Sequence, residues 1–285
     1  MRFPTLVRRA VAAGAVVAAG VATAAGAITL APAAVAAAPA AGTLESTIAL
    51  NNCSASLVRF AASQDTDRAL MLTNGHCYEG GFLAAGQVLQ NRSSTRSGTL
   101  LDASGASSGT VRADRLVYAT MTGTDVALYR LTETYAAVRS RTGRTALTLA
   151  SSPAAAGTSI AVESGYWKRI WSCQVETYVP TVREGDWTWH DSARYSRPGC
   201  DIIGGSSGSP VVDRGSGQVV AINNTINEDG QSCTVDNPCE VGADGSTTAV
   251  EGYGYAQQTY WFTTCLSSGR TIDLDVSGCK LTKPN

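Results

Sequence analysis

The amino-acid sequence predicts an all-β protein with two β modules of similar size. Between residues 44 and 150, short apolar stretches such as SASLVRF and DVALYRL are separated by polar clusters rich in glycine and serine. A second set of the same kind, including IWSCQVETYV and QVVAINNTI, follows the connector LASSPAAAGTS. Stretches of this length and spacing are typical of a β-barrel or a β-sandwich. Helical periodicity is poor almost everywhere, and TYWFTTCLSS at 259–268 is the segment in which we expect a short helical turn.

The beginning of the chain is typical of a secretory signal peptide. Arginines near the start precede an apolar run from Ala10 to Leu30, and small residues follow. The alternative is a membrane anchor, but Pro32 and the alanine-rich segment after it suit a signal peptidase better. We therefore expect a signal peptide at 1–38, an N-terminal β module at 39–150, and a C-terminal β module with a tail at 151–285.

Without this leader the chain is mildly acidic. Removing it takes three arginines from the 22 basic residues and none from the 23 acidic ones, so the formal net charge falls from −1 to −4. Nothing in that balance attracts nucleic acid or an anionic membrane. We expect a secreted, monomeric protein that binds neither of them.

All eight cysteines follow the leader. An even number of cysteines in an exported chain implies disulfides, although the pairing is open at this point. The chain has no C-x-x-C sequence and only two histidines, so the close ligand spacing of a zinc site is missing. We expect no metal and no cofactor. The cysteines are Cys53, Cys77, Cys173, Cys200, Cys233, Cys239, Cys265 and Cys279.

The run IIGGSSGSPVVD, at 202–213, holds more glycine and serine than a helix or a buried strand favours. Part of it also satisfies G-x-S-x-G, the nucleophile elbow of the α/β hydrolases. That fold needs its histidine after the serine. His76 and His190 both precede the run, and the chain lacks alternating helices. We therefore reject an α/β hydrolase.

Ser207 is the candidate nucleophile in this run. Gly205 and Gly208 let the backbone turn tightly and leave access to the serine open. Such a turn can aim the amides of Gly205 and Ser207 at one point, where they would stabilise the oxyanion of a tetrahedral intermediate. A serine hydroxyl also needs a general base, and that base needs an orienting carboxylate.

His76 is the candidate base and Asp125 the candidate carboxylate. His76 follows the apolar stretch in ALMLTNGHC, beside a cysteine whose disulfide would hold it in place. His190 lies in GDWTWHDSARY, a polar aromatic stretch that we interpret as a surface loop with a structural histidine. Asp125 opens the alternating stretch DVALYRL. It could simply cap a turn, but its position between the histidine and the serine favours the catalytic interpretation.

Three motifs together resemble those of the trypsin-like (chymotrypsin-fold) serine endopeptidases, bacterial secreted type. LTNGHC, TDVALYRL and GGSSGSPVV look like that family's histidine, aspartate and serine motifs, in the family's order. CSASLV resembles the strand whose cysteine pairs with the one after the histidine. The resemblance covers residues 44 to about 262. It implies an all-β fold of two antiparallel six-stranded β-barrels with the active site in the cleft between them.

The resemblance also implies a role for each residue. His76 would be the general base, Asp125 would orient it, and Ser207 would attack the carbonyl. The amides of Gly205 and Ser207 would form the oxyanion hole, and Cys53 would pair with Cys77. Nearest-neighbour pairing is our expectation for the other cysteines, with each closure contributing about 2–4 kcal/mol. Those pairs are Cys173–Cys200, Cys233–Cys239 and Cys265–Cys279.

The residues expected around the substrate depart from the family's patterns. Animal members carry an aspartate just before the nucleophile to receive the freed N-terminus; here Ser206 stands there, so we expect no zymogen activation by that route. The neighbouring glycines and serine resemble the glutamyl-endopeptidase branch, but Ile202 and Asn223 stand where that branch holds glutamate with threonine and histidine. Asp201 stands where trypsin-like enzymes bind Arg or Lys, and a solvated aspartate is the alternative there. Asp201, Ile202 and Asn223 are therefore candidate substrate-binding residues, and the side-chain specificity is open.

We expect, in sum, a secreted serine endopeptidase that cleaves a polypeptide substrate through an acyl-enzyme intermediate. Two alternatives are open: a catalytically silent binding module with this fold, and an esterase that uses the same triad. The polar segment 225–245 faintly resembles a calcium loop at Asn227, Asp229 and Gly230. Its first position is Thr225 rather than aspartate, so we do not expect calcium there.

Overall fold

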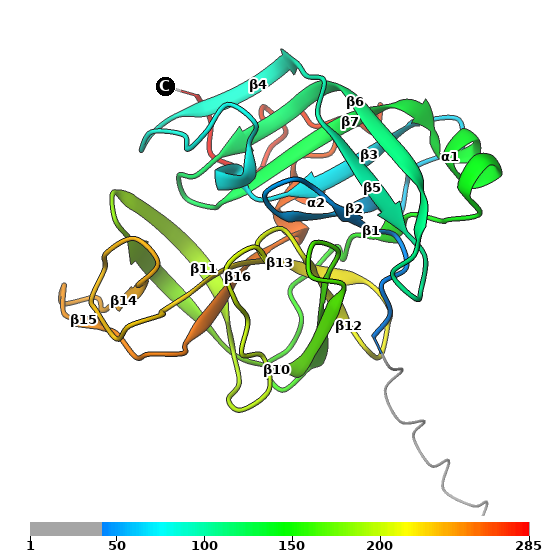
Figure 1. Ribbon diagram of the computed structural model, residues 1–285. Coiled ribbons are helices and arrows are strands. Elements are labelled where there is room, and N and C mark those ends of the chain that lie inside the picture. Colours follow the sequence, from blue (N-terminus) through cyan, green and yellow to red (C-terminus); the bar gives the residue numbers. More distant parts are fainter. Residues whose placement is uncertain (1–41, 285) are drawn as a thin grey trace, which may run out of the picture. The chain divides into compact units, whose positions relative to one another are not determined.

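Two antiparallel β-sheets organise the protein, and each closes into a ring (Figure 1). The computed structural model describes residues 42–284. The first sheet runs in the order β1-β5-β6-β7-β3-β2-β8, and an additional β1–β2 pairing closes six of its strands into a barrel. Strand β4 extends the sheet beside β6, and β8 pairs in parallel with β2. The strands are β1 (Thr47–Ala49), β2 (Ser54–Arg59), β3 (Arg68–Thr73), β4 (Val88–Ser93), β5 (Ser97–Leu101), β6 (Ser107–Thr120), β7 (Val126–Thr134) and β8 (Leu147–Thr148).

The second sheet runs in the order β11-β16-β13-β12-β9-β10-β14-β15. A β10–β11 pairing again closes six strands, and the short β14–β15 hairpin extends from β10. The predicted all-β fold with two antiparallel six-stranded barrels is therefore confirmed. The strands are β9 (Ser159–Ser164), β10 (Arg169–Glu184), β11 (Trp187–Tyr195), β12 (Pro210–Asp213), β13 (Val219–Ile226), β14 (Cys239–Val241), β15 (Thr247–Thr248) and β16 (Gly254–Gln258).

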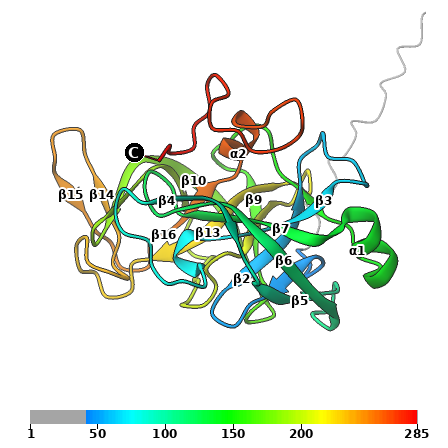
Figure 2. The ribbon, with the colours of Figure 1, turned by 90° about the horizontal axis from the view of Figure 1, so that it is seen from above.

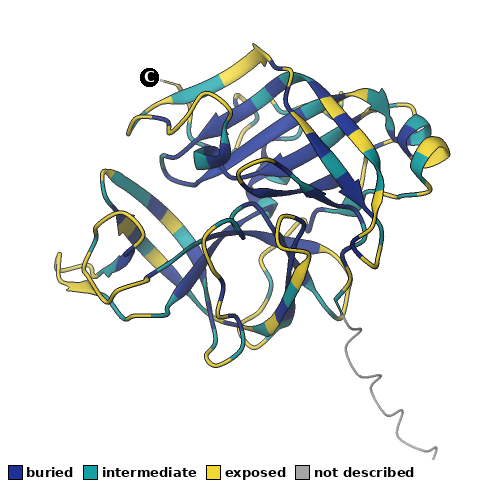
Figure 3. Cartoon of the chain, viewed as in Figure 1, coloured by how far each residue is buried: buried dark blue, intermediate teal, exposed yellow. Residues whose placement is uncertain are grey.

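Apolar, often β-branched residues in the barrel strands give each sheet a buried inner face. Strands β12 and β13 are buried along most of their length, whereas β4 is exposed over most of its residues (Figure 3). The connector at 149–159 bridges the two sheets, because β8 ends the first and β9 begins the second.

Helices contribute little. Helix α2 (Tyr260–Thr264) lies within the segment that was expected to form a helical turn. Helix α1 (Tyr135–Thr142) was not predicted. Its caps were nevertheless visible in the sequence, since the Thr134 hydroxyl accepts a hydrogen bond from the Ala137 amide and Gly143 ends the helix in the left-handed conformation.

One apolar cluster joins both barrels to the C-terminal segment, which Figure 2 shows from above. Phe262 of α2 is fully buried and meets Tyr118 of β6 edge-to-face, with ring centroids 6.3 Å apart. The tail after α2 adds two buried leucines to the cluster and is tied back to α2 by a disulfide. The cluster draws on the first barrel (Val58, Leu72, Tyr118), the second barrel (Val212, Val219, Ile222) and the C-terminal segment (Trp261, Phe262, Leu274, Leu281).

Every cysteine is paired in the structure, in the four pairs given above. The Cys53–Cys77 bond joins the start of β2 to the 3-10 helix η1 (Gly75–Cys77), which follows β3. Cys173–Cys200 joins β10 to the segment before the serine-rich run. Two of the four disulfides therefore anchor segments that flank the expected catalytic residues.

Two interpretations of the sequence were wrong. His190 does not lie in a surface loop: it is an exposed residue of β11, where tryptophan and tyrosine supply the buried positions. The alternation was hidden because its inward residues are aromatic, serine and alanine rather than aliphatic. The polar segment 225–245 also contains a short strand, β14.

The expected signal peptide at 1–38 lies outside the described residues. Within residues 42–284, no helix reaches the length and apolarity that crossing a bilayer requires.

We expect Phe262→Ala to lower the free energy of unfolding by about 3–5 kcal/mol, because it opens a cavity where both barrels meet the C-terminal segment. Urea unfolding followed by tryptophan fluorescence measures the change. Phe82→Ala is the matched control, since the Phe82 side chain is 60% exposed. Equal losses in the two variants would contradict this account of the core.

Candidate active site

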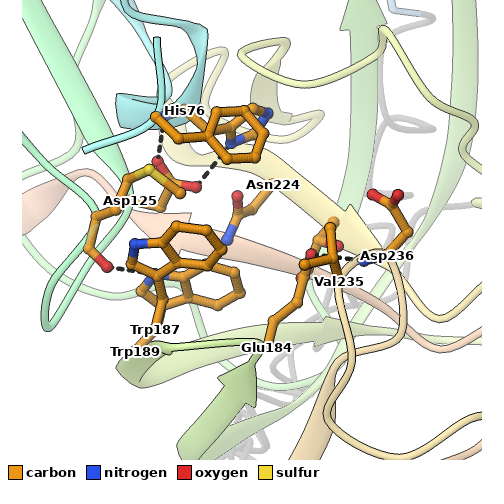
Figure 4. Close-up of a pocket in the computed structure, with 11 residues that line it drawn as sticks. His76, Asp125, Glu184, Trp187, Trp189, Asn224, Val235 and Asp236 are labelled. Atoms are coloured by element: carbon orange, nitrogen blue, oxygen red, sulfur yellow. Dashed lines mark hydrogen bonds and ion pairs between the residues drawn. The ribbon is translucent and has the colours of Figure 1, made fainter. Parts of the chain in front are cut away.

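His76 and Asp125 are in direct contact. His76 lies in η1 at the end of β3, and Asp125 immediately precedes β7. The His76 ring nitrogen Nδ1 lies 2.7 Å from Asp125 Oδ2, and the His76 amide donates to Oδ1 at 3.0 Å (Figure 4). The Asn74 side-chain amide donates to the Asp125 carbonyl oxygen at 2.8 Å. Asp125 is only 1% exposed. Two of these contacts hold His76 against this buried carboxylate, and the third holds Asp125 itself.

This approach requires glycine at position 75. A Cβ atom there would lie 2.0 Å from the Thr120 carbonyl oxygen and 2.9 Å from Asp125 Oδ1. Any side chain would therefore push η1 away from β6 and from the carboxylate. The disulfide at Cys77 anchors the other side of the histidine.

Opposing effects set the pKa of His76. Burial favours the neutral imidazole and lowers the pKa, whereas the charge and hydrogen bond of Asp125 favour the imidazolium. The carboxylates of Glu184 and Asp236 raise the pKa further. The charges outweigh burial, so the pKa of His76 lies above its ordinary value.

The loop that carries Ser207 is held between the two barrels. The Ser54 amide at the start of β2 donates to the Ser207 carbonyl oxygen at 2.8 Å. The Gly208 amide donates to the Asn223 carbonyl oxygen of β13 at 2.9 Å. Gly208 has a φ of +79°, and a Cβ there would lie 2.1 Å from Ser54 O and 2.2 Å from Thr73 Oγ1. Only glycine fits this passage, which explains the residue after the candidate nucleophile.

The Ser207 hydroxyl points toward Asn224. It donates to the Asn224 carbonyl oxygen at 3.2 Å, and no hydrogen bond among residues 42–284 joins it to His76. Ser207 and Asn224 line one pocket, and Asn224 also lines the pocket that holds His76 and Asp125. The structure thus brings the histidine and the aspartate together and places the serine in an adjoining pocket.

Two amides beside Ser207 are free. Within residues 42–284, the amides of Gly205 and Ser207 donate to no protein acceptor, whereas those of Ser206 and Gly208 donate to the carbonyl oxygens of Ile203 and Asn223. These two free donors are the ones that the sequence assigns to an oxyanion hole.

Ser206 occupies a buried and neutral hydrogen-bond network. Its hydroxyl donates to the Ile203 carbonyl oxygen at 2.5 Å and accepts from the Asn223 side-chain amide at 3.0 Å. The Asn223 side-chain oxygen in turn accepts from the Tyr195 hydroxyl at 2.9 Å. Asn223 is fully buried and is not among the residues that line the Ser207 pocket, so its visible role is to hold the loop.

The other two candidate substrate-binding residues differ in position. Ile202 is buried and lines the Ser207 pocket. Asp201 is exposed and is not among the lining residues.

The sequence analysis missed Glu184, at the end of β10, which shares a pocket with His76 and Asp125 (Figure 4). Trp187 and Trp189 of β11 form part of the same pocket, and Asp236 lines both this pocket and the Ser207 pocket. No local signal distinguishes Glu184 from a solvated glutamate at a hairpin. Only the pairing of β10 with β11 and the packing of the two barrels bring it to the histidine.

A profile of the trypsin-like peptidase domain family matches residues 58–222, more than half of the chain, and this span includes His76, Asp125 and Ser207. The chain belongs to the trypsin-like peptidase family. Membership in this family supports a peptidase activity, in agreement with the motifs recognised in the sequence. No curated protein matches the chain.

Solved structures of bacterial proteases are similar to this trypsin-like peptidase. The active form of the Rv3671c protease from M. tuberculosis is 14% identical with a TM-score of 0.48, covering 85% of this chain and 84% of that one. The MamO protease domain from Magnetospirillum magneticum is 12% identical with a TM-score of 0.48, covering 79% and 98%. The Nocardiopsis protease NAPase is 16% identical with a TM-score of 0.40, covering 74% and 89%. At identities this low, the substrates of these proteases are not evidence for the substrate of this chain.

One group of potential metal ligands in the trypsin-like peptidase lies at His76. The sulfur atoms of Cys53 and Cys77 and a ring nitrogen of His76 lie within 4.8 Å of one another. The two sulfurs form a disulfide, so they are not the thiolates that a metal ion would bind.

We expect Asp125→Asn to lower the pKa of His76 below 6.5. With the carboxylate replaced by an amide, the effect of burial prevails over the remaining charges. NMR titration of the two histidine rings measures the change, and His190 is the internal control because it lies exposed on β11. A His76 pKa that is unchanged in the variant would contradict the assigned contact.

Proposed function

We propose that this trypsin-like peptidase is a secreted serine endopeptidase that hydrolyses polypeptides through a triad of Ser207, His76 and Asp125. The 2.7 Å contact between His76 Nδ1 and Asp125 Oδ2 carries the proposal. It selects the tautomer in which Nδ1 carries the proton and Nε2 is free to accept one. The four disulfides support export to an oxidising compartment.

The first half of the reaction forms an acyl-enzyme. The Ser207 hydroxyl rotates from Asn224 O toward His76 Nε2, which takes its proton as Oγ bonds to the carbonyl carbon of the substrate. Such contacts are often long or misaligned without substrate and tighten when it binds. The free amides of Gly205 and Ser207 stabilise the negative oxygen of the tetrahedral intermediate.

The second half regenerates the enzyme. The His76 imidazolium, stabilised by Asp125, returns its proton to the leaving amine as the peptide C–N bond breaks. Water then attacks the ester carbonyl, gives a proton to Nε2, and releases the carboxylic acid while Ser207 Oγ regains its proton. No group beyond this chain and water is needed.

An esterase with the same triad and a silent binding module are the competing functions. The esterase would use the same residues, so parallel assays with matched ester and peptide substrates separate it from an endopeptidase. The Ser207–Asn224 hydrogen bond is the one observation that favours a silent module.

We expect a sulfonyl fluoride to form one covalent adduct on Ser207, located by peptide mapping and mass spectrometry, with parallel loss of peptide hydrolysis. Ser207→Ala should abolish both the adduct and the hydrolysis. Ser216→Ala, at an exposed turn, is the control and should keep both. An unlabelled Ser207, or full activity in Ser207→Ala, would overturn the catalytic proposal.

The pH profile of kcat/KM should show an acid limb above pH 6.5. The base acts only when neutral, so activity rises as pH increases through the raised pKa of His76. Salt should move this limb toward lower pH by screening the exposed Asp236 carboxylate, which helps to raise the pKa of His76. A limb below the ordinary histidine pKa would contradict the assignment.

A further inference from the structure

Glu184 is the most poorly satisfied charged group near the catalytic candidates. Glu184 is 7% exposed, so its carboxylate lies almost entirely out of solvent. One oxygen, Oε1, accepts a hydrogen bond from the Asp236 amide at 2.9 Å. The other, Oε2, is buried without a hydrogen-bond partner. Burial raises the pKa of Glu184 to about 7, although the Thr225 side chain, the Asp236 amide and the charge of His76 oppose this rise.

The pocket that Glu184 lines has aromatic walls. Phe82 lies edge-on to both His76 and Trp187. The indole N–H groups of Trp187 and Trp189 donate to backbone carbonyl oxygens at 2.8 and 3.0 Å. These indoles therefore have no free donor for Glu184 and present apolar ring surface to an occupant (Figure 4).

The charges around the pocket have one sign. Asp236 lines both this pocket and the Ser207 pocket, and Glu228 lines the latter. None of the described residues that line either pocket is a lysine or an arginine. When His76 is neutral, an incoming acidic side chain would meet only repulsion, and an apolar one would leave Glu184 Oε2 buried and unpaired.

The pocket lies next to the proposed reaction centre. His76 and Asp125 form one of its walls, and Asn224, Thr225 and Asp236 are shared with the Ser207 pocket. A peptide with one side chain in the Ser207 pocket would place a neighbouring side chain here, because residues of an extended chain advance only about 3.3 Å each.

We propose that the Glu184 pocket is a subsite for a lysine or arginine side chain of the substrate, next to the residue that occupies the Ser207 pocket. The cation supplies the missing partner of Glu184 Oε2, and its alkyl stem and charge contact the aromatic walls. This inference rests on the proposed peptidase function and adds its substrate class: peptides with a basic residue beside the scissile bond.

The test compares peptides that differ at one residue. Substrates carry lysine, arginine, norleucine or glutamate at each position flanking a cleavable bond, and kcat/KM is measured at about pH 8.5. That pH lies above the pKa of Glu184, so its carboxylate is ionised. The wild-type protein should prefer lysine and arginine over norleucine by about 10- to 100-fold at one position. Glutamate should be the poorest residue there.

Glu184→Gln separates recognition from a structural role, because the amide keeps an oxygen for the Asp236 N–H. The preference for lysine over norleucine should fall to about twofold, with little change for the norleucine peptide. Glu251→Gln is the matched control: Glu251 is exposed, lines neither pocket, and its loss changes the net charge equally. Equal losses for all peptides in Glu184→Gln, or a preference that survives it, would overturn the subsite.

A binding measurement keeps this outcome distinct from failure of the proposed function. Calorimetric titration of Ser207→Ala with the lysine and norleucine peptides should give about tenfold tighter binding of the lysine peptide. Adding Glu184→Gln should remove that difference. If the wild-type protein cleaves no peptide, the endopeptidase proposal fails. Equal binding constants for the two peptides would overturn the subsite, whether or not the wild-type protein cleaves them.

Discussion

The arrangement of the site depends on Ser54, a fully buried residue at the start of β2. Its amide donates to the Ser207 carbonyl oxygen, and its hydroxyl lies 2.8 Å from that of Ser164 in the second barrel. Its neighbour Cys53 is disulfide-bonded to the residue that follows His76. One short segment therefore ties the serine loop, the histidine and both barrels together. Because β2 is a buried strand of a closed barrel, small movements at the surface do not separate the Ser207 loop from His76.

His76 is influenced by two carboxylates, Asp125 and Glu184, which differ in their hydrogen bonding. Asp125 is buried and hydrogen-bonded to His76, so in the proposed reaction it would stabilise the imidazolium that forms during proton transfer. Glu184 acts on His76 through charge, with no hydrogen bond between them, and its Oε2 has no hydrogen-bond partner. A carboxylate that acted on His76 alone would not need a buried Oε2 without a hydrogen-bond partner. The difference in hydrogen bonding, more than the proximity of the charges, is why we propose that Asp125 orients His76 and that Glu184 contacts the substrate.

The sequence predicted the features that depend on residues close to one another in the chain. The barrels follow from repeated apolar stretches, and His76, Asp125 and Ser207 follow from motifs in which glycine and cysteine neighbours are sterically required, as the contacts at Gly75 and Gly208 show. Glu184 could not be predicted, because its burial arises only when β10 pairs with β11 and the first barrel covers the hairpin. Strand β11 was missed for a related reason, since its buried positions include polar and aromatic residues. Long-range packing, not local propensity, decides both.

The loop around Ser207 is held by groups that stay neutral. Ser206, Asn223 and Tyr195 form its buried network, and burial keeps the pKa of Tyr195 far above the physiological range. An aspartate in place of Ser206 would require a cation, as in relatives that use a freed N-terminus, and would make the loop sensitive to pH. With a serine there, ionisation leaves the geometry of the two free amides unchanged. Under the proposed mechanism, the pH dependence of activity would therefore report on His76 and on the carboxylates that line the pockets, rather than on the geometry of the two free amides.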